Sequence, residues 1–194
     1  MRKCILFAAP GVLILAVGLA CAQTTTPGKR QPTLALPSSG QSTLPGQFSQ
    51  VSELRATPST IPFMANNPGG VVLGGTVATI TWDIAHGNNG RTWTLMVGTT
   101  SQTFSGCTTV PESAISVKCV SAWVAGGGQS SAGCNMASFT PLPNSLPGLS
   151  MASGNEGNAS SHDYTVVLNY QLADSWRYRA NVCPLNVSYT VVAQ

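Results

Sequence analysis

Charge is scarce in this chain. Only 8% of its 194 residues are charged, whereas about 25% is usual in soluble domains. From Thr57 onward four Lys and Arg side chains stand against five Asp and Glu, which leaves that region with a net charge of −1. Proteins that bind nucleic acid neutralise phosphates with clustered Lys and Arg. No such cluster is present in this region, and nucleic acid is therefore not an expected partner.

Residues that commonly carry chemistry are also few. His86 and His162 are the only histidines, and an acidic residue, Asp83 or Asp163, lies near each of them. Such a pair can act as a general base with its orienting acid, but paired groups also occur in purely structural networks. We expect two solvent-facing histidines in loops. No C-x₂-C pair is present and neither His lies beside a Cys, so the spacing does not match a zinc site.

Two motifs, one for a catalytic serine and one for phosphate binding, are incomplete in this chain. Residues 148–152 read Gly-Leu-Ser-Met-Ala, which lacks the final Gly of the G-x-S-x-G turn and its strand-to-helix context. The Gly run at 126–128 lacks the Lys and the helix of a phosphate-binding loop. We therefore expect no catalytic residue, no cofactor and no metal. Hydrolysis by two loop carboxylates about 5–9.5 Å apart stays open as an alternative. The acids concerned are Glu112, Glu156 and Asp163.

Calcium is a weaker candidate. Oxygen-bearing side chains in the expected loops are of the kind that calcium prefers, but no D-x-D-x-D-G run joins them. Asn and Asp are also common in turns, where they bond to their own backbone. The residues concerned are Asn88, Asn89, Glu156, Asn158, Asp163 and Asp174.

The N-terminus has the pattern of an export signal. Two basic residues precede an uncharged, mostly apolar run that ends in Ala-Cys-Ala. This order is typical of a secretory signal peptide, and we expect residues 1–22 to be removed. A membrane anchor is an alternative, because the run is just long enough to span a bilayer. Lipidation of Cys21 is another, because residues 18–21 resemble a bacterial lipoprotein box.

Export makes the remaining cysteines interpretable. Beyond the expected signal peptide the chain has four: Cys107, Cys119, Cys134 and Cys183. An even number in an oxidising compartment predicts disulfides. We expect the pairs Cys107–Cys119 and Cys134–Cys183, because the first pair brackets one expected strand and turn. The mature protein is then secreted, periplasmic or at the cell surface, without a transmembrane span.

A linker and one domain follow the signal. Residues 23–56 are rich in Thr, Pro, Ser and Gln, and such a composition buries too little apolar surface to offset the entropy lost on ordering. We expect this segment to be disordered. The spacing of Leu44, Phe48, Val51 and Leu54 leaves open one short helix or a strap packed on the domain.

Residues 57–194 show the pattern of an all-β domain. Apolar and polar residues alternate in short runs, which predicts strands with one buried face. A Gly/Asn-rich stretch at 86–90 and Ala173-Asp174 are expected turns. Many short antiparallel strands of this kind form a sandwich or a barrel, and we expect an antiparallel β-sandwich. The runs lie at 78–82, 93–97, 115–119, 164–172, 175–182 and 187–191.

Part of this domain resembles known modules. Residues 77–83 (VATITWD), the Gly/Asn turn and residues 93–97 (WTLMV) look like the second and third strands of immunoglobulin-like or fibronectin type III modules. The segment from 164 to 193 is similar to their last strands. The resemblance implies an immunoglobulin-like sandwich that serves as a spacer, an adhesive unit or a binding unit of a secreted bacterial protein. No functional residue carries over, because the Cys…Trp…Cys order of antibody domains is absent.

The large rings divide into a core set and two exceptions. Rings on the apolar side of their runs are expected in the core: Trp82, Trp93, Tyr164, Tyr170, Trp176, Tyr178 and Tyr189. Trp123 and Phe139 do not follow this pattern. Sugars stack on exposed rings, so a carbohydrate-binding module that uses Trp123 is an alternative. The main interpretation is a non-catalytic structural or interaction module whose partner is a protein or a glycan at the cell surface.

Overall fold

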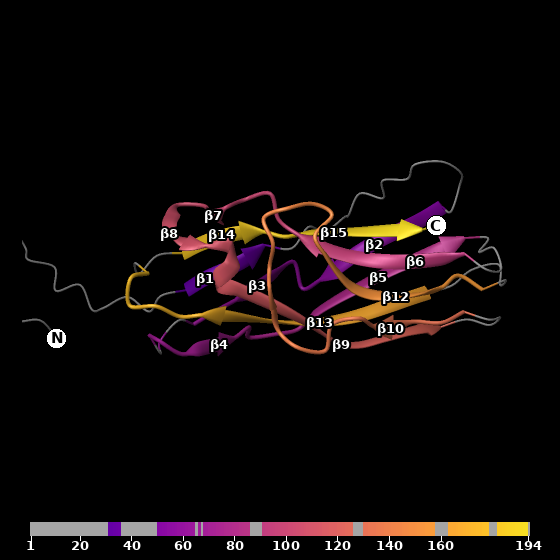
Figure 1. The fold of residues 1–194 in the computed structure, drawn as a ribbon, viewed down its shortest axis with the longest axis horizontal. Helices are drawn as coiled ribbons and strands as arrows, with labels where there is room; N and C mark the ends of the chain where they lie inside the picture. The colour runs from indigo at the N-terminus through magenta and orange to yellow at the C-terminus, as the bar shows by residue number, and fades with distance from the viewer. Residues whose placement is uncertain are drawn as a thin grey trace, which may run out of the picture.

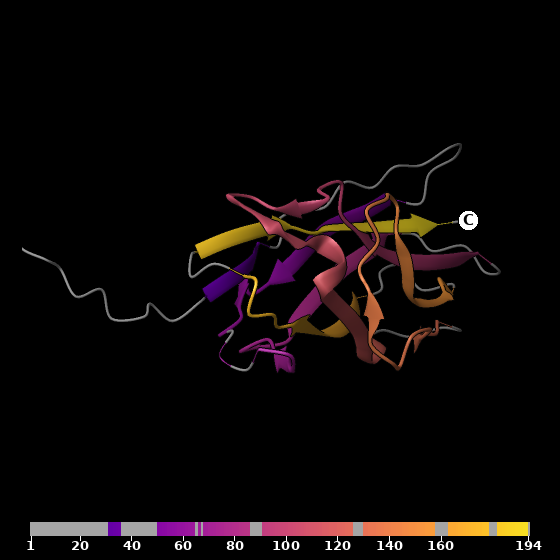
Figure 2. The same cartoon turned by 60° about the vertical axis from the view of Figure 1, so that its left-hand side comes forward.

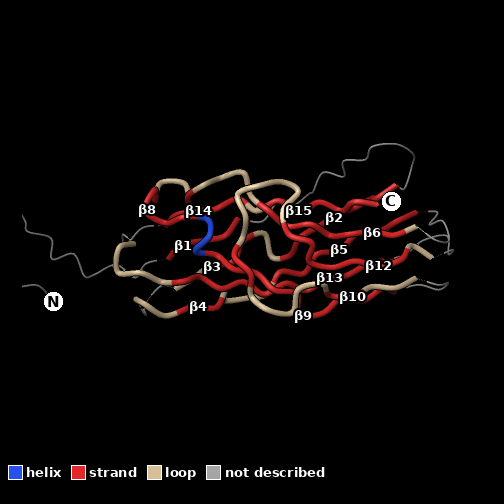
Figure 3. Tube along the Cα trace, viewed as in Figure 1, coloured by secondary structure: helices blue, strands red, loops and turns tan. Residues whose placement is uncertain are grey.

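The fold is known from a computed structural model, which describes residues 31–35, 50–64, 66, 68–85, 91–125, 130–157, 163–178 and 182–193. Strands dominate these residues, and one 3-10 turn, η1 (Glu112–Ala114), interrupts them (Figure 3). The expected all-β class is therefore confirmed. No helix in the described part of the chain is long and apolar enough to cross a membrane. The expected signal peptide and Cys21 lie outside the described residues.

Two antiparallel sheets form the sandwich (Figure 1). The larger sheet has the order β11-β9-β13-β5-β2, with β4 paired to the end of β13, and the smaller has the order β10-β12-β6-β15. The larger sheet comprises β2 (Gln50–Thr57), β4 (Val71–Leu73), β5 (Ala78–Ala85), β9 (Ile115–Ala125), β11 (Thr140–Pro141) and β13 (Asp163–Ala173). The smaller comprises β6 (Thr92–Gly98), β10 (Gly133–Cys134), β12 (Leu149–Asn155) and β15 (Ser188–Ala193).

A short third sheet joins the two large ones along one side. It has the order β14-β1-β3, with β1 (Gln31–Ala35), β3 (Thr60–Pro62) and β14 (Val182–Asn186). Strand β14 leads into β15 after one residue, and β2 leads into β3 after two. β1 therefore lies between the extensions of both edge strands, parallel to β14 and antiparallel to β3. Figures 1 and 2 both show this N-terminal strand (indigo) beside the C-terminal part of the chain (yellow).

The expectation of disorder over 23–56 is wrong for two stretches. Strand β1 and most of β2 lie inside this range. Backbone hydrogen bonds to strands on both sides order β1, and these bonds do not require a periodic side-chain pattern. The strap interpretation is correct for the end of the segment, because Leu54 is buried and Val51 packs against the core. Leu44 and Phe48 lie outside the described residues.

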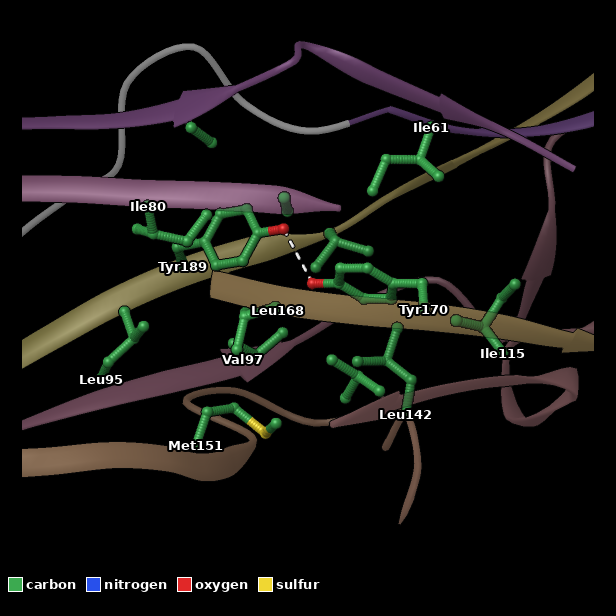
Figure 4. Packing of buried hydrophobic residues seen from close by; sticks show 14 of the residues in the cluster. Ile61, Ile80, Leu95, Val97, Ile115, Leu142, Met151, Leu168, Tyr170 and Tyr189 are labelled. Atoms are coloured by element: carbon green, nitrogen blue, oxygen red, sulfur yellow. Dashed lines mark hydrogen bonds between the residues drawn. The ribbon is translucent and has the colours of Figure 1, made fainter. Parts of the chain in front are cut away.

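The core consists of apolar residues that point inward from the sheets and fill the space between them (Figure 4). The expected inward residues of β5, β6, β9, β13 and β15 are all buried. Trp82 contacts both Trp93 and Tyr164, with ring centroids 5.0 and 5.5 Å away. At the other end of β13, the hydroxyl groups of Tyr170 and Tyr189 lie 2.8 Å apart. Alternation therefore predicted the core of these strands correctly.

The disulfide pairing differs from the prediction. The bonds join Cys107 to Cys183 and Cys119 to Cys134, with Cα atoms 5.8 and 5.6 Å apart. The hairpin of β7 (Thr103–Phe104) and β8 (Cys107–Pro111) lies beside β14, where Ser105 N donates to the Pro184 carbonyl at 2.9 Å. That contact brings Cys107 to the C-terminal part of the chain. Sequence spacing could not show it, because the two strands are far apart in the chain.

The expected hairpin at Ala173-Asp174 is also wrong. After β13 the backbone NH of Asp174 donates to the Gly70 carbonyl at 2.9 Å, and the next residues form a turn. Trp176 is 71% exposed instead of buried, and Tyr178 is half-buried. The next strand, β14, pairs with β1 and not with β13. Over residues 175–178, the alternation therefore does not reflect a strand with one buried face.

Candidate functional site

The outer face of the larger sheet carries a row of side chains that crosses four strands. Thr165 on β13 lies opposite Trp123 on β9 and Thr81 on β5, and Thr81 lies opposite Arg55 on β2. Directly opposed residues point to the same face of a sheet. Their neighbours Tyr164 and Trp82 are buried, so the row points away from the core. An aromatic ring and a guanidinium group thus lie at the two ends of one row.

A second row, one step nearer the end of the sandwich, is acidic. Asp83 on β5 lies directly opposite Asp163 on β13. Side chains opposed in this way have Cβ atoms about 5 Å apart, and like charges in this position destabilise a sheet. The pair thus presents carboxylate oxygens, which accept hydrogen bonds, beside Thr81 and Thr165.

A bulge in the edge strand β2 adds a third carboxylate. The pairing of β2 with β5 shifts between Ser52 and Arg55, and Glu53 inside the bulge has a φ of 55°. This left-handed conformation is uncommon for a residue other than Gly, and bulges re-aim side chains. The Glu53 carboxylate accepts a hydrogen bond from Arg55 Nη2 at 3.1 Å, and both side chains are about two-thirds exposed (70% and 66%).

These rows surround a shallow cavity of about 240 Å³. It is lined by Glu53, Arg55, Thr81, Trp82, Asp83, Asp163, Tyr164 and Thr165. Its volume is below the roughly 300–1,000 Å³ of sites that enclose a small molecule. The cavity can therefore hold a side chain or one ring of a larger ligand, but not enclose a whole ligand.

A rigid aromatic cluster lies under the cavity. Tyr164 donates its hydroxyl hydrogen to the carbonyls of Asn155 and Glu156, at 3.1 and 3.2 Å. Burial raises the pKa of Tyr164 to about 12, because the charged phenolate is poorly solvated there. Its ring stacks on Trp82 at 13° between planes. The walls of the cavity are thus fixed by packing in the core.

Trp123 is exposed, as predicted, but its setting differs from the prediction. The side chain is 47% exposed and stands on strand β9, not in a loop. Its neighbours Ala122 and Val124 pack against the core, which holds the strand in place. Phe139, the other exception, is half-buried with Lys118 Nζ 4.7 Å from its ring centre. Of the two rings, only Trp123 offers an open face.

The predicted loop carboxylates do not converge. Glu112 lies in η1 before β9 begins, whereas Asp163 pairs with Ala125 at the end of β9. The 11 residues of β9 span roughly 35 Å at about 3.3 Å per residue. Glu156 is fully buried. The three acids considered for hydrolysis therefore form no common site.

Other predicted positions carry no visible site. His86, His162, Asn88, Asn89 and Asn158 lie outside the described residues. Ser150 is part of strand β12, where its Oγ accepts a hydrogen bond from Asn135 Nδ2 at 2.7 Å. Asp174 is buried. Among the residues with described positions, no three His, Cys, Asp or Glu side chains are grouped to hold a metal ion.

Little in the sequence predicts the cavity. Glu53 and Arg55 fall in the segment expected to be disordered, and the bulge that turns them outward leaves no recognisable pattern. From the sequence alone, Asp83 is a candidate only as the acidic neighbour of His86. The alternation of β5 and β13 nevertheless predicts that Asp83 and Asp163 lie on the solvent-facing side of their strands. That the two residues lie directly opposite each other follows only from the pairing register of the strands.

A scan against protein-family models finds no match, and a search of curated proteins finds no similar chain. The function is therefore inferred from the site itself. The site combines an exposed ring, two threonine hydroxyl groups and an acidic cavity on one sheet.

Proposed function

We propose that this chain is an exported, non-catalytic binding module that holds its partner on the outer face of the larger sheet. The observation that carries this proposal is the row from Trp123 to Arg55, beside the cavity that Glu53, Asp83 and Asp163 line. Strands hold every one of these residues. A site on strands is positioned more rigidly than one on loops, which suits binding.

Export is supported by two observations of different kinds. The N-terminal residues have the pattern of a signal peptide. The structure contains two disulfides, which are usual outside the cytoplasm and rare within it. The site of action is thus the periplasm, the cell surface or the medium, with lipidation at Cys21 as an alternative means of attachment. The immunoglobulin-like character of the sandwich remains part of this proposal.

We propose a non-catalytic role because the site is open to solvent. Enzymes exclude water from the reacting groups, whereas the Asp83–Asp163 pair lies on an open face beside a shallow cavity. Glu112 and Glu156 are not available to complete a catalytic pair with Asp163, for the reasons given above. An open face with fixed side chains is suited to hold a ligand without changing it.

Sedimentation with the envelope fraction of the producing cells tests this function. We expect the exported chain to co-sediment, Trp123→Ala to remain in the supernatant, and Trp176→Ala to behave as wild type. Trp176 is a matched control because it is an exposed ring beyond the opposite end of β13. Equal sedimentation of both variants would refute the proposed face. Hydrolysis of envelope polymers that Asp83→Asn or Asp163→Asn abolishes would refute the non-catalytic role.

A further inference from the structure

We infer that the ligand of this face is an uncharged oligosaccharide, which lies across the strands from Trp123 to the cavity at Arg55. This inference rests on the proposed binding function and names the chemistry of the partner. Three features carry it: the exposed ring, the length of the row and the polar character of the cavity.

The ring supplies the apolar contact. Trp123 is 47% exposed on the same face as Thr165 and Thr81. A pyranose ring has an apolar face of C–H groups that stacks on indole, and its hydroxyl groups point to the sides. The hydroxyl-bearing side chains beside Trp123 are placed where these sugar hydroxyls would need partners. An apolar ligand would leave those side chains without hydrogen bonds, which is costly.

The length of the row sets the size of the ligand. Trp123 on β9 and Arg55 on β2 are separated by β13 and β5, that is by three strand spacings of about 4.8 Å, or roughly 14 Å. One sugar ring cannot reach both ends of this row. The cavity occupies the part of the row between Arg55 and Thr165, so a chain of several rings can stack on Trp123 and place its next rings along the cavity toward Arg55.

The cavity determines which sugars fit. Glu53, Asp83 and Asp163 offer oxygen acceptors, and Arg55 offers donors. Sugar hydroxyls both donate and accept, so they can use both kinds of group. The four side chains carry a net charge of −2, because three are acidic and one is basic. This charge repels carboxylated or phosphorylated glycans, and an uncharged glycan meets no such barrier.

A protein partner fits the face less well. A stable protein interface buries about 800 Å² on each side and has an apolar core depleted in charged residues. The centre of this face is occupied by carboxylates and threonines, with one exposed aromatic ring in the part of it that is described. The exposed apolar residues Val71 and Leu73 lie on β4, toward the opposite end of β13. These two are too far from Trp123 to form an interface core with it, and Val120, which is 52% exposed in the bulge of β9, adds only one apolar side chain near the ring.

Calorimetry with defined sugars tests the inference. The exported chain is titrated with the hexaoses of cellulose, xylan, mannan and chitin, and with hexagalacturonate as an acidic glycan. We expect at least one uncharged hexaose to bind and hexagalacturonate not to bind. Trp123→Ala should weaken binding about tenfold, and Glu53→Gln and Asp163→Asn should also weaken it, whereas Trp176→Ala should not. Absence of binding to every uncharged hexaose, or equal binding by Trp123→Ala, would overturn the inference.

A second measurement separates this inference from the proposed function. Before sedimentation, the envelope fraction is treated with proteinase or with periodate, which opens sugar rings at vicinal diols such as those of cellulose, xylan and mannan; chitinase replaces periodate if the chitin hexaose is the one that binds. Loss of Trp123-dependent binding after periodate alone supports a glycan. Loss after proteinase alone would show that the face binds a protein, which would overturn the inference and leave the binding function intact. If the untreated fraction does not bind the chain, the proposed function itself fails.

Discussion

At the scale of single residues, the buried hydroxyl pair of Tyr170 and Tyr189 gives the most direct test of the core (Figure 4). Each hydroxyl group is the other's partner, and both residues are almost fully buried. Tyr170→Phe leaves the Tyr189 hydroxyl unpaired, which should cost about 1–3 kcal/mol of unfolding free energy. The double Phe variant removes both polar groups and should recover most of that loss. Additive losses in urea titrations of the single and double variants would show that the two hydroxyl groups do not interact.

Glu53 combines a left-handed backbone with a carboxylate in the proposed binding site. Gly adopts a φ of 55° without the steric cost of a side chain, so Glu53→Gly should stabilise the fold by up to about 1 kcal/mol. Glu53→Ala keeps a Cβ and should not stabilise it. Both variants lack the carboxylate and should bind sugar less tightly. Thermal unfolding and titration of the same samples measure both effects, and a lower unfolding temperature for Glu53→Gly would contradict the bulge geometry.

Ionisation of Tyr164 makes the fold sensitive to alkali. Its pKa is raised by burial to about 12, from about 10 in an unfolded chain. The stability that this group contributes is thus fully present below pH 10 and is lost as the pH rises through 12. Tyr164→Phe should be less stable than wild type at pH 8, since the hydrogen bonds to the Asn155 and Glu156 carbonyls are missing, and the difference should shrink toward pH 12. A difference that grows with pH in thermal unfolding would refute this.

At the scale of elements, the alternation of apolar and polar residues predicts the strands that bury one face against the core. Trp82 and Trp93 were placed correctly in β5 and β6, because a buried face leaves a period of two in the sequence. The same signal failed at Trp176, where a run of alternating residues forms a turn. It also missed β1, whose order depends on backbone bonds to β3 and β14. Pairing between distant strands is not encoded by any local pattern.

The two disulfides should differ in their effect on stability. The loop between Cys107 and Cys183 spans 76 residues and that between Cys119 and Cys134 spans 15. Loop entropy in the unfolded chain predicts a loss of about 4 to 5 kcal/mol when the first is removed and about 3 kcal/mol when the second is removed. Replacement of each pair by Ser, followed by denaturant titration, measures this order. A larger loss from the shorter loop would contradict the loop-entropy account for this protein.

At the scale of the whole molecule, the N-terminal strand links the extensions of two edge strands. β1 bonds to β3, which extends β2, on one side and to β14, which extends β15, on the other, whereas β2 and β15 themselves are the edge strands of the two large sheets. The outer face of the larger sheet remains open at Trp123 and at the cavity. In the proposed function, the core and the binding site therefore use opposite faces of the same strands β5 and β13.

The outer face of the larger sheet is proposed to bind the ligand. The decisive test of this proposal is the affinity of Trp123→Ala and Trp176→Ala for the uncharged hexaose that binds the wild type. Both substitutions remove an exposed indole from the same chain, so an effect of general surface hydrophobicity would appear in both. We predict a loss of about tenfold in affinity for Trp123→Ala, wild-type affinity for Trp176→Ala, and unchanged unfolding temperatures. Equal affinities for the two variants, or a loss only in Trp176→Ala, would contradict the assignment of binding to the outer face.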